Sequence, residues 1–185
     1  MNIRELLEDN PIIAAVKDEN GLEKALQSDA EIIFMLFGDL INIKYLSKKI
    51  KDANKIGIVH ADLVEGLNNK EIAIKYIKNE TSFNGILSTK SQLIKAAKNY
   101  GLIAIQRVFV FDTISLNNSK SHIVKECDAV EVLPGVIPKV IKKISISSNK
   151  PIVSGGLIES KEDVILALSA GASCVSTSNN QIWGI

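Results

Sequence analysis

The chain has 185 residues, of which 46% are hydrophobic and 23% charged, a composition that favours one globular domain over residues 1–185. Its formal net charge is +1, so overall electrostatics give no reason to expect nucleic-acid or membrane binding. The two cysteines form neither a disulfide framework nor a metal-ligand spacing, and no signal peptide or apolar run of about 20 residues is present, so we expect a cytoplasmic protein.

Short apolar runs recur along the chain with amphipathic segments between them. Most runs are apolar at consecutive positions, which is typical of strands buried on both faces of a parallel sheet. The eight expected strands span residues 11–16, 31–37, 55–61, 84–89, 102–107, 128–134, 151–156 and 172–177. The expected helices include 42–52, 70–79, 90–101, 136–145 and 160–171. Ser160 and Asp163 have the spacing of a capping box, and Gly171 is a helix stop.

Eight strands that alternate with helices predict an α/β fold, namely a small TIM-type (β/α)8 barrel, with a doubly wound open sheet as the alternative. Because about 200 residues is near the lower limit for this barrel, we expect one or more helices to be reduced or missing. The segment 17–30, between the first two strands, leaves room for only a small helix.

Two adjacent glycines, Gly155 and Gly156, follow the seventh expected strand, and Ser176 and Thr177 end the eighth. In many such barrels the loops after these two strands hold a phosphate with the help of a short extra helix. Backbone N–H groups of the glycine turn and the two hydroxyls could bind phosphate oxygens here, with one helical turn in the tail. A tight turn followed by a helix cap, without a ligand, is the alternative.

Charged and polar residues gather at the ends of the other strands, where the functional residues of these folds lie. Such a set predicts the mouth of a site for a small polar anion, in which carboxylates accept hydrogen bonds from ligand hydroxyls. Solvated charges on the rim are the alternative interpretation. The predicted mouth comprises Lys17, His60, Asp62, Lys90, Arg107 and Glu131.

His60 and Asp62 are the sharpest candidates for catalysis, because residues two apart on a strand share a face and could supply two metal ligands. A similar H-x-D-x-x-x-G segment binds a divalent metal in sugar-phosphate epimerases of the ribulose-phosphate type. Those enzymes need a second histidine from another strand end, whereas His122 lies in a polar, helical stretch. We therefore predict no metal site and no catalytic residue, with His60 as a neutral hydrogen-bonding group. A Schiff base on Lys90 or Lys17 is a further enzymatic hypothesis, but no proton relay supports it.

Several long segments resemble the glycerol uptake operon antiterminator family, the glycerol-3-phosphate-responsive regulators of bacteria. The resemblance runs from about residue 9 to residue 184, nearly the whole chain. The matching segments are NPIIAAVKDENGLEKAL, EIIFMLFGDLINI, VHADLVEGL, GILSTK, GLIAIQRVFVFDT, EVLPGVIPKVI, PIVSGGLIESKEDVILALSAGA and VSTSNNQIW.

This resemblance implies a barrel-like regulator that is not an enzyme and needs no cofactor. Its effector would be glycerol 3-phosphate, which supplies one phosphate and the hydroxyls expected above. It would bind the leader mRNA of a glycerol operon, prevent premature termination and stabilise the transcript, and the effector would order the loops after strands seven and eight. A small phospho-sugar isomerase, epimerase or lyase on a reduced barrel is the alternative function.

The RNA-binding role rests on the resemblance, since no RNA-binding signature is present. Two lysine clusters are candidate contacts, although solvated helix surface is the alternative for both, and a homodimer could join them into one longer surface. Phe109 and Phe111 are expected to anchor their loop, with stacking on bases as the alternative. The clusters comprise Lys48 and Lys49 in one segment and Lys139, Lys142 and Lys143 in another.

Overall fold

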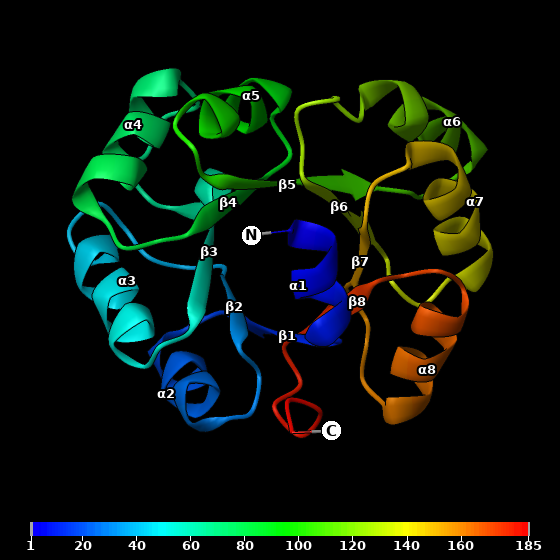
Figure 1. The fold of residues 1–185 in the computed structure, drawn as a ribbon, viewed down its shortest axis with the longest axis horizontal. Coiled ribbons are helices and arrows are strands. Elements are labelled where there is room, and N and C mark those ends of the chain that lie inside the picture. The colour runs from blue at the N-terminus through cyan, green and yellow to red at the C-terminus, as the bar shows by residue number, and fades with distance from the viewer. Residues whose placement is uncertain (1, 185) are drawn as a thin grey trace.

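The computed structural model describes residues 2–184, except for the side chain of Lys120. Eight parallel strands form a closed barrel in which each strand pairs with its neighbours in the sequence and β8 pairs with β1 (Figure 1). The predicted (β/α)8 barrel is confirmed, and the open-sheet alternative is wrong. The strands are β1 (Ile12–Val16), β2 (Ile32–Met35), β3 (Ile56–His60), β4 (Gly85–Ser88), β5 (Ile103–Phe109), β6 (Ala129–Leu133), β7 (Ile152–Gly155) and β8 (Cys174–Thr177).

The strands are apolar at consecutive positions because both of their faces are buried. One set of alternating side chains, such as Ile13, Phe34 and Ile105, fills the inside of the barrel. The other set, such as Ala14 and Ile33, packs outward against the ring of helices. Two hydrophobic clusters result, one inside the sheet and one around it, and all five residues of β1 are buried.

A helix follows each of the first seven strands and covers the outside of the barrel (Figure 1). The expected capping box of the last helix is present, since Ser160 accepts from the N–H of Asp163 and Asp163 caps in return. Gly101 and Gly171 end their helices with positive φ. The helices are α2 (Glu19–Gln27), α3 (Ile43–Asp52), α4 (Glu71–Glu80), α5 (Ser91–Asn99), α6 (Thr113–His122), α7 (Pro138–Ser148) and α8 (Lys161–Ser169), with a 3-10 turn η1 (Ala61–Leu63) before α4.

The missing helix is the one that would follow β8. Residues 178–184 form bends and turns instead, and the expected single turn in the tail is present, since the N–H groups of Ile182 and Trp183 donate to the carbonyls of Asn179 and Asn180 at 3.2 and 3.4 Å. The tail is anchored by the buried side chain of Trp183, whose indole N–H donates to the carbonyl of Thr177 at 2.8 Å.

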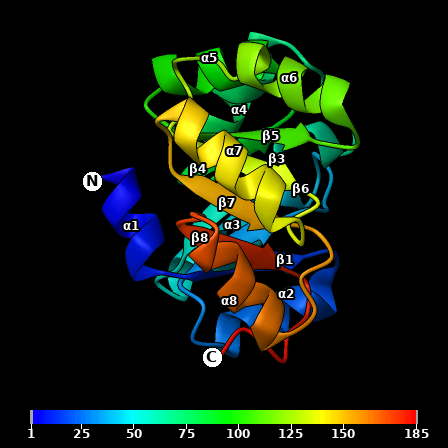
Figure 2. The ribbon, with the colours of Figure 1, turned by 90° about the vertical axis from the view of Figure 1, so that its right-hand side faces the viewer.

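The sequence did not predict α1 (Ile3–Asp9), which lies across the amino-terminal end of the barrel (Figures 1 and 2). Asn2 caps this helix, and the buried side chain of Leu7 packs into the cluster inside the barrel with Ile3 and Leu6. One end of the barrel is thereby closed, and the functional residues of such barrels lie at the opposite, carboxyl end. In residues 2–184, no helix is both long and apolar enough to cross a membrane.

We predict that Leu7→Ala lowers the free energy of unfolding by about 2–5 kcal/mol, the range for removing a buried leucine and leaving a cavity. Urea denaturation measures this change. Glu5→Ala, an exposed change in the same helix, serves as the control and should alter stability by only a few tenths of a kcal/mol. Equal effects of the two substitutions would show that α1 does not seal the barrel.

Candidate functional site

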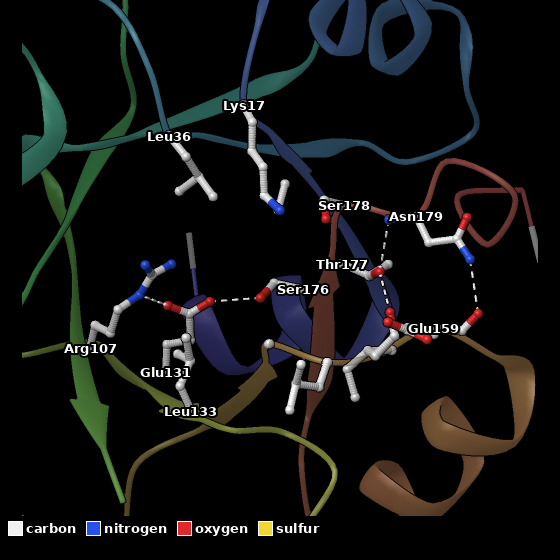
Figure 3. A pocket seen from close by; sticks show the side chains of 14 residues that line it. Lys17, Leu36, Arg107, Glu131, Leu133, Glu159, Ser176, Thr177, Ser178 and Asn179 are labelled. Carbon is white, nitrogen blue, oxygen red and sulfur yellow. Dashed lines mark hydrogen bonds and ion pairs between the residues drawn. The ribbon is translucent and has the colours of Figure 1, made fainter.

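A cavity of about 600 Å³ opens at the carboxyl ends of the strands. Apolar side chains such as Leu36 and Leu133 form part of its wall, and Lys17 and Arg107 enter it from different strands (Figure 3). Its size falls within the range of small-molecule sites, about 300–1,000 Å³. The cavity is lined by Ala15, Lys17, Leu36, Arg107, Glu131, Leu133, residues 156–159 and residues 176–179.

A buried polar network forms one wall of this cavity (Figure 3). The Arg107 Nε donates to Glu131 Oε2 at 2.5 Å, and the Ser176 hydroxyl donates to Glu131 Oε1 at 2.6 Å. Glu131 is only 1% exposed, so its charge requires these partners. The side chains come from β5, β6 and β8. The network therefore fixes three strand ends relative to one another and satisfies the carboxylate inside the barrel.

The two adjacent glycines at the end of β7 are each required for a different structural reason. A Cβ on Gly155 would lie 2.6 Å from both Glu131 Oε1 and Ser176 Oγ, so a side chain there would displace the network. Gly156 has a φ of +77°, which favours glycine, and it lines the cavity. Gly155 is buried behind the network and does not line the cavity.

Leu157 continues this turn with a φ of +62°, an outlier for a bulky residue, and its side chain is exposed. Such outliers cluster at ligand-binding loops, where the rest of the structure holds them in place. Here Gly156, Leu157 and Ile158 of the turn line the cavity. Within residues 2–184, the N–H groups of Gly156, Leu157, Ile158 and Ser178 make no hydrogen bond. Sequence patterns gave no sign of Leu157, because its only signal is a backbone angle.

The predicted phosphate hydroxyls are already engaged inside the protein. Ser176 donates to Glu131, and the Thr177 hydroxyl donates to the carbonyl of Ile158 at 2.7 Å. Thr177 also accepts from the N–H of Asn179, so it ties the tail to the loop after β7. Among the described residues, the free donors at the cavity include backbone amides, the Lys17 ammonium and the terminal N–H groups of Arg107, rather than these hydroxyls.

Three of the six residues predicted for the mouth line the cavity, namely Lys17, Arg107 and Glu131. The other three do not. Asp62 faces the end of β4, where it accepts from Ser88 Oγ at 2.5 Å and from the N–H and hydroxyl of Thr89 at 2.8 and 2.6 Å. Burial would raise the pKa of the Asp62 carboxyl, but these hydrogen bonds outweigh burial and hold the pKa below its usual value.

His60 ends β3 inside the barrel and is 3% exposed. Burial lowers its pKa to about 4, and the positive charge of Arg107 adds to this effect. The imidazole is therefore neutral at pH 7. In the part of the chain that the structure describes, its Nδ1 is the one buried side-chain N or O atom without a hydrogen-bond partner.

Other reactive groups lie away from the cavity. Lys90 is exposed at the start of α5 and does not line it. Burial raises the pKa of the Cys127 thiol to about 11 and that of Cys174 further, so neither is a thiolate at neutral pH. No group of three or more His, Cys, Asp or Glu residues in residues 2–184 is placed to hold a metal ion.

The two lysine clusters lie on opposite sides of the barrel and differ in their partners (Figure 1). On α3, Lys48 pairs with Asp52 at 2.8 Å and Lys49 pairs with Glu23 of α2. On α7, Lys139, Lys142 and Lys143 are exposed and take part in no ion pair among the described residues. Only the α7 cluster offers unneutralised charge.

The sequence of this chain is similar to that of a known protein family and of a bacterial protein. Residues 12–183 match the family described as "Glycerol-3-phosphate responsive antiterminator". The chain is 39% identical to the Escherichia coli (strain K12) protein YgcP, described as uncharacterized, over 99% of this chain and 96% of YgcP.

Two solved structures of glycerol uptake operon antiterminator proteins are similar to this chain in both sequence and fold. The glycerol uptake operon antiterminator regulatory protein from Listeria monocytogenes is 36% identical, with a TM-score of 0.91 over 95% of each chain. A glycerol uptake operon antiterminator-related protein from Thermotoga maritima is 32% identical, with a TM-score of 0.83 over 94% of this chain and 98% of that one. Deoxyribose phosphate aldolase from Aeropyrum pernix, at 14% identity and a TM-score of 0.68 over 98% of this chain and 95% of that one, shares the fold alone.

We predict that the free energy of unfolding falls as the pH drops from about 6.5 to about 4. In this window the unfolded chain protonates His60, whereas the folded protein does not. The unfolded state therefore binds more protons than the folded state. Proton binding favours unfolding, and the free energy of unfolding falls by about 3 kcal/mol over this window. Urea denaturation across this pH range, on the wild type and on His60→Gln, isolates the contribution. Parallel pH dependences in the two proteins would contradict the buried, neutral imidazole.

Proposed function

We propose that this chain, which belongs to the family of glycerol-3-phosphate responsive antiterminators, is a cytoplasmic regulator of glycerol-utilisation genes. It senses glycerol 3-phosphate and binds the leader mRNA so that transcription does not terminate prematurely. The observation that carries the effector half of this proposal is that the cavity brings Lys17 and the loops after β7 and β8 together with the pair of Arg107 and Glu131.

The phosphate binds at the loops after β7 and β8. Four backbone N–H groups that make no hydrogen bond within residues 2–184, those of Gly156, Leu157, Ile158 and Ser178, line this side of the cavity. Lys17 also lines it and makes no ion pair with the described residues. Clustered amides with a nearby ammonium are a recurrent way to bind phosphate, because every contact is a charge-assisted hydrogen bond.

The glycerol part binds toward the network. Glu131 is acceptor-only when ionised and can take a hydrogen bond from a ligand hydroxyl, while Arg107 can donate to one. Leu36 and Leu133 provide apolar contacts for the carbon chain. The pair of Arg107 and Glu131 is neutral overall, and Glu159 at the cavity is exposed to solvent, so Lys17 is the cation left to contact the phosphate.

Binding of the effector orders the loops after β7 and β8, and with them a surface that binds RNA. The exposed lysines of α7 are the phosphate-backbone contacts in this proposal, because the lysines of α3 are neutralised by carboxylates. The protein is a regulator rather than an enzyme, which the family membership supports.

We predict saturable binding of sn-glycerol 3-phosphate in a calorimetric titration, without consumption of the ligand. Glycerol and inorganic phosphate, each of which engages one side of the cavity, should bind more weakly. Lys17→Gln should weaken binding about 10-fold or more, the effect of losing one hydrogen bond to a charged group. Lys90→Gln is the matched control, since Lys90 lies outside the cavity and its loss should leave the affinity unchanged.

Equal losses in both variants would place the anion outside this cavity. Conversion of the ligand during the titration would support the alternative function, a phospho-sugar isomerase, epimerase or lyase on the same barrel.

We predict that the double variant Lys142→Gln and Lys143→Gln weakens binding of a leader transcript in filter-binding assays with the effector present. The slope of log affinity against log salt concentration should become shallower by about 0.7 for each RNA phosphate that the variant no longer neutralises. Lys48→Gln with Lys49→Gln is the matched control and should change the slope little. A larger effect from this control pair would assign RNA binding to α3 instead.

A further inference from the structure

We propose that Phe109 and Phe111, with the polar cavity beside them, form a stacking site for an unpaired base of single-stranded RNA. This inference rests on the RNA-binding function proposed above and assigns a surface to it. The site lies between the end of β5 and the start of α6, apart from the α7 lysines and outside the effector cavity.

The two rings are held together but are left exposed. Their centroids are 5.9 Å apart and their planes differ by 8°, so they form an offset stack. Phe109 is 42% exposed and Phe111 is 81% exposed, and neither ring packs against a core cluster. The expectation that they anchor their loop is therefore wrong. Their apolar faces are available to a partner, and every nucleobase offers a π-face for such stacking.

A second cavity, of about 280 Å³, is lined by Phe109 and mainly by polar side chains of β5 and α6. The side-chain amide of Asn118, in this lining, makes no hydrogen bond within the described residues. His122 uses only its Nδ1, toward the carbonyl of Asn118. An amide offers a donor and an acceptor together, which is the pattern needed to bind the edge of a base whose face is stacked.

The surrounding charge suits a polyanion. Helices α6 and α7 pack against each other, and neither contains an aspartate or glutamate. The lysines of α7 lie on the helix next to α6, while Asp112, beside Phe111 in the chain, caps α6 through the N–H of Ser115 and keeps its negative charge. A strand of RNA could place a base on Phe111 and its phosphates along α7.

The same strand connects this surface to the effector cavity. Arg107 lines both cavities, and Phe109 lies two residues further along β5. An effector hydroxyl that binds Glu131 would share this carboxylate with Arg107, which also lines the second cavity. We therefore expect glycerol 3-phosphate to strengthen the binding of RNA at this site.

Fluorescence anisotropy in the presence of sn-glycerol 3-phosphate tests the proposal with two RNA probes. One probe is a leader transcript. The other is a fluorescein-labelled, mixed-sequence RNA of about 12 nucleotides, a length within the range that single-strand sites cover. Phe111→Ala should weaken binding of both probes by about 5- to 100-fold, the usual effect of removing one stacking ring, with the salt slope unchanged. Phe111→Trp should retain binding, and RNA should quench the introduced indole. Ile72→Ala, an exposed apolar residue on α4, is the matched control and should bind as the wild type does.

The outcomes separate this inference from the function on which it rests. If the wild type binds RNA and Phe111→Ala binds equally well, the stacking site is wrong while the regulatory function stands. If the wild type binds neither probe, both fail. Sedimentation velocity gives the remaining outcome: conversion of a wild-type dimer into monomers by Phe111→Ala would make this surface an interface between two copies and would overturn the proposal.

Discussion

The carboxylate of Glu131 is the constraint on which the carboxyl end of the barrel depends. A charge that is 1% exposed must be neutralised and fully hydrogen-bonded, and Arg107 and Ser176 do this from two other strands. The space needed for these contacts excludes a side chain at Gly155. The shape of the mouth therefore follows from satisfying one buried acid, and the cavity at the carboxyl end is built against that network.

Using such a network as the wall of a ligand site makes the site responsive. The network is neutral without a ligand, and the Glu131 carboxylate, which accepts two hydrogen bonds, can accept a further one from a bound hydroxyl. Any rearrangement of Arg107 reaches the second cavity directly, because this side chain lines both cavities. A scaffold shared with aldolases can in this way serve as a sensor, since the fold fixes only where the strand ends meet.

Much of the fold could be predicted because burial leaves a simple pattern. Strands such as β2 and β7 are covered on both faces and are recognised as short apolar runs, while α8 has a capping box and a glycine stop. Helix α1 was missed because only one of its residues, Leu7, is fully buried, and a short charged segment with few apolar positions resembles a free terminus.

By itself, the sequence determined the alternation of strands and helices and the set of polar residues that end the strands. Only the tertiary structure decided which of these residues line the cavity. The direction of a side chain at a strand end depends on barrel closure and on the loop that folds over it, so Lys17 and Glu131 line the cavity while Asp62 holds β4. The sequence likewise could not show which lysines are neutralised by carboxylates, since the partner of Lys49 is Glu23, on another helix and 26 residues earlier.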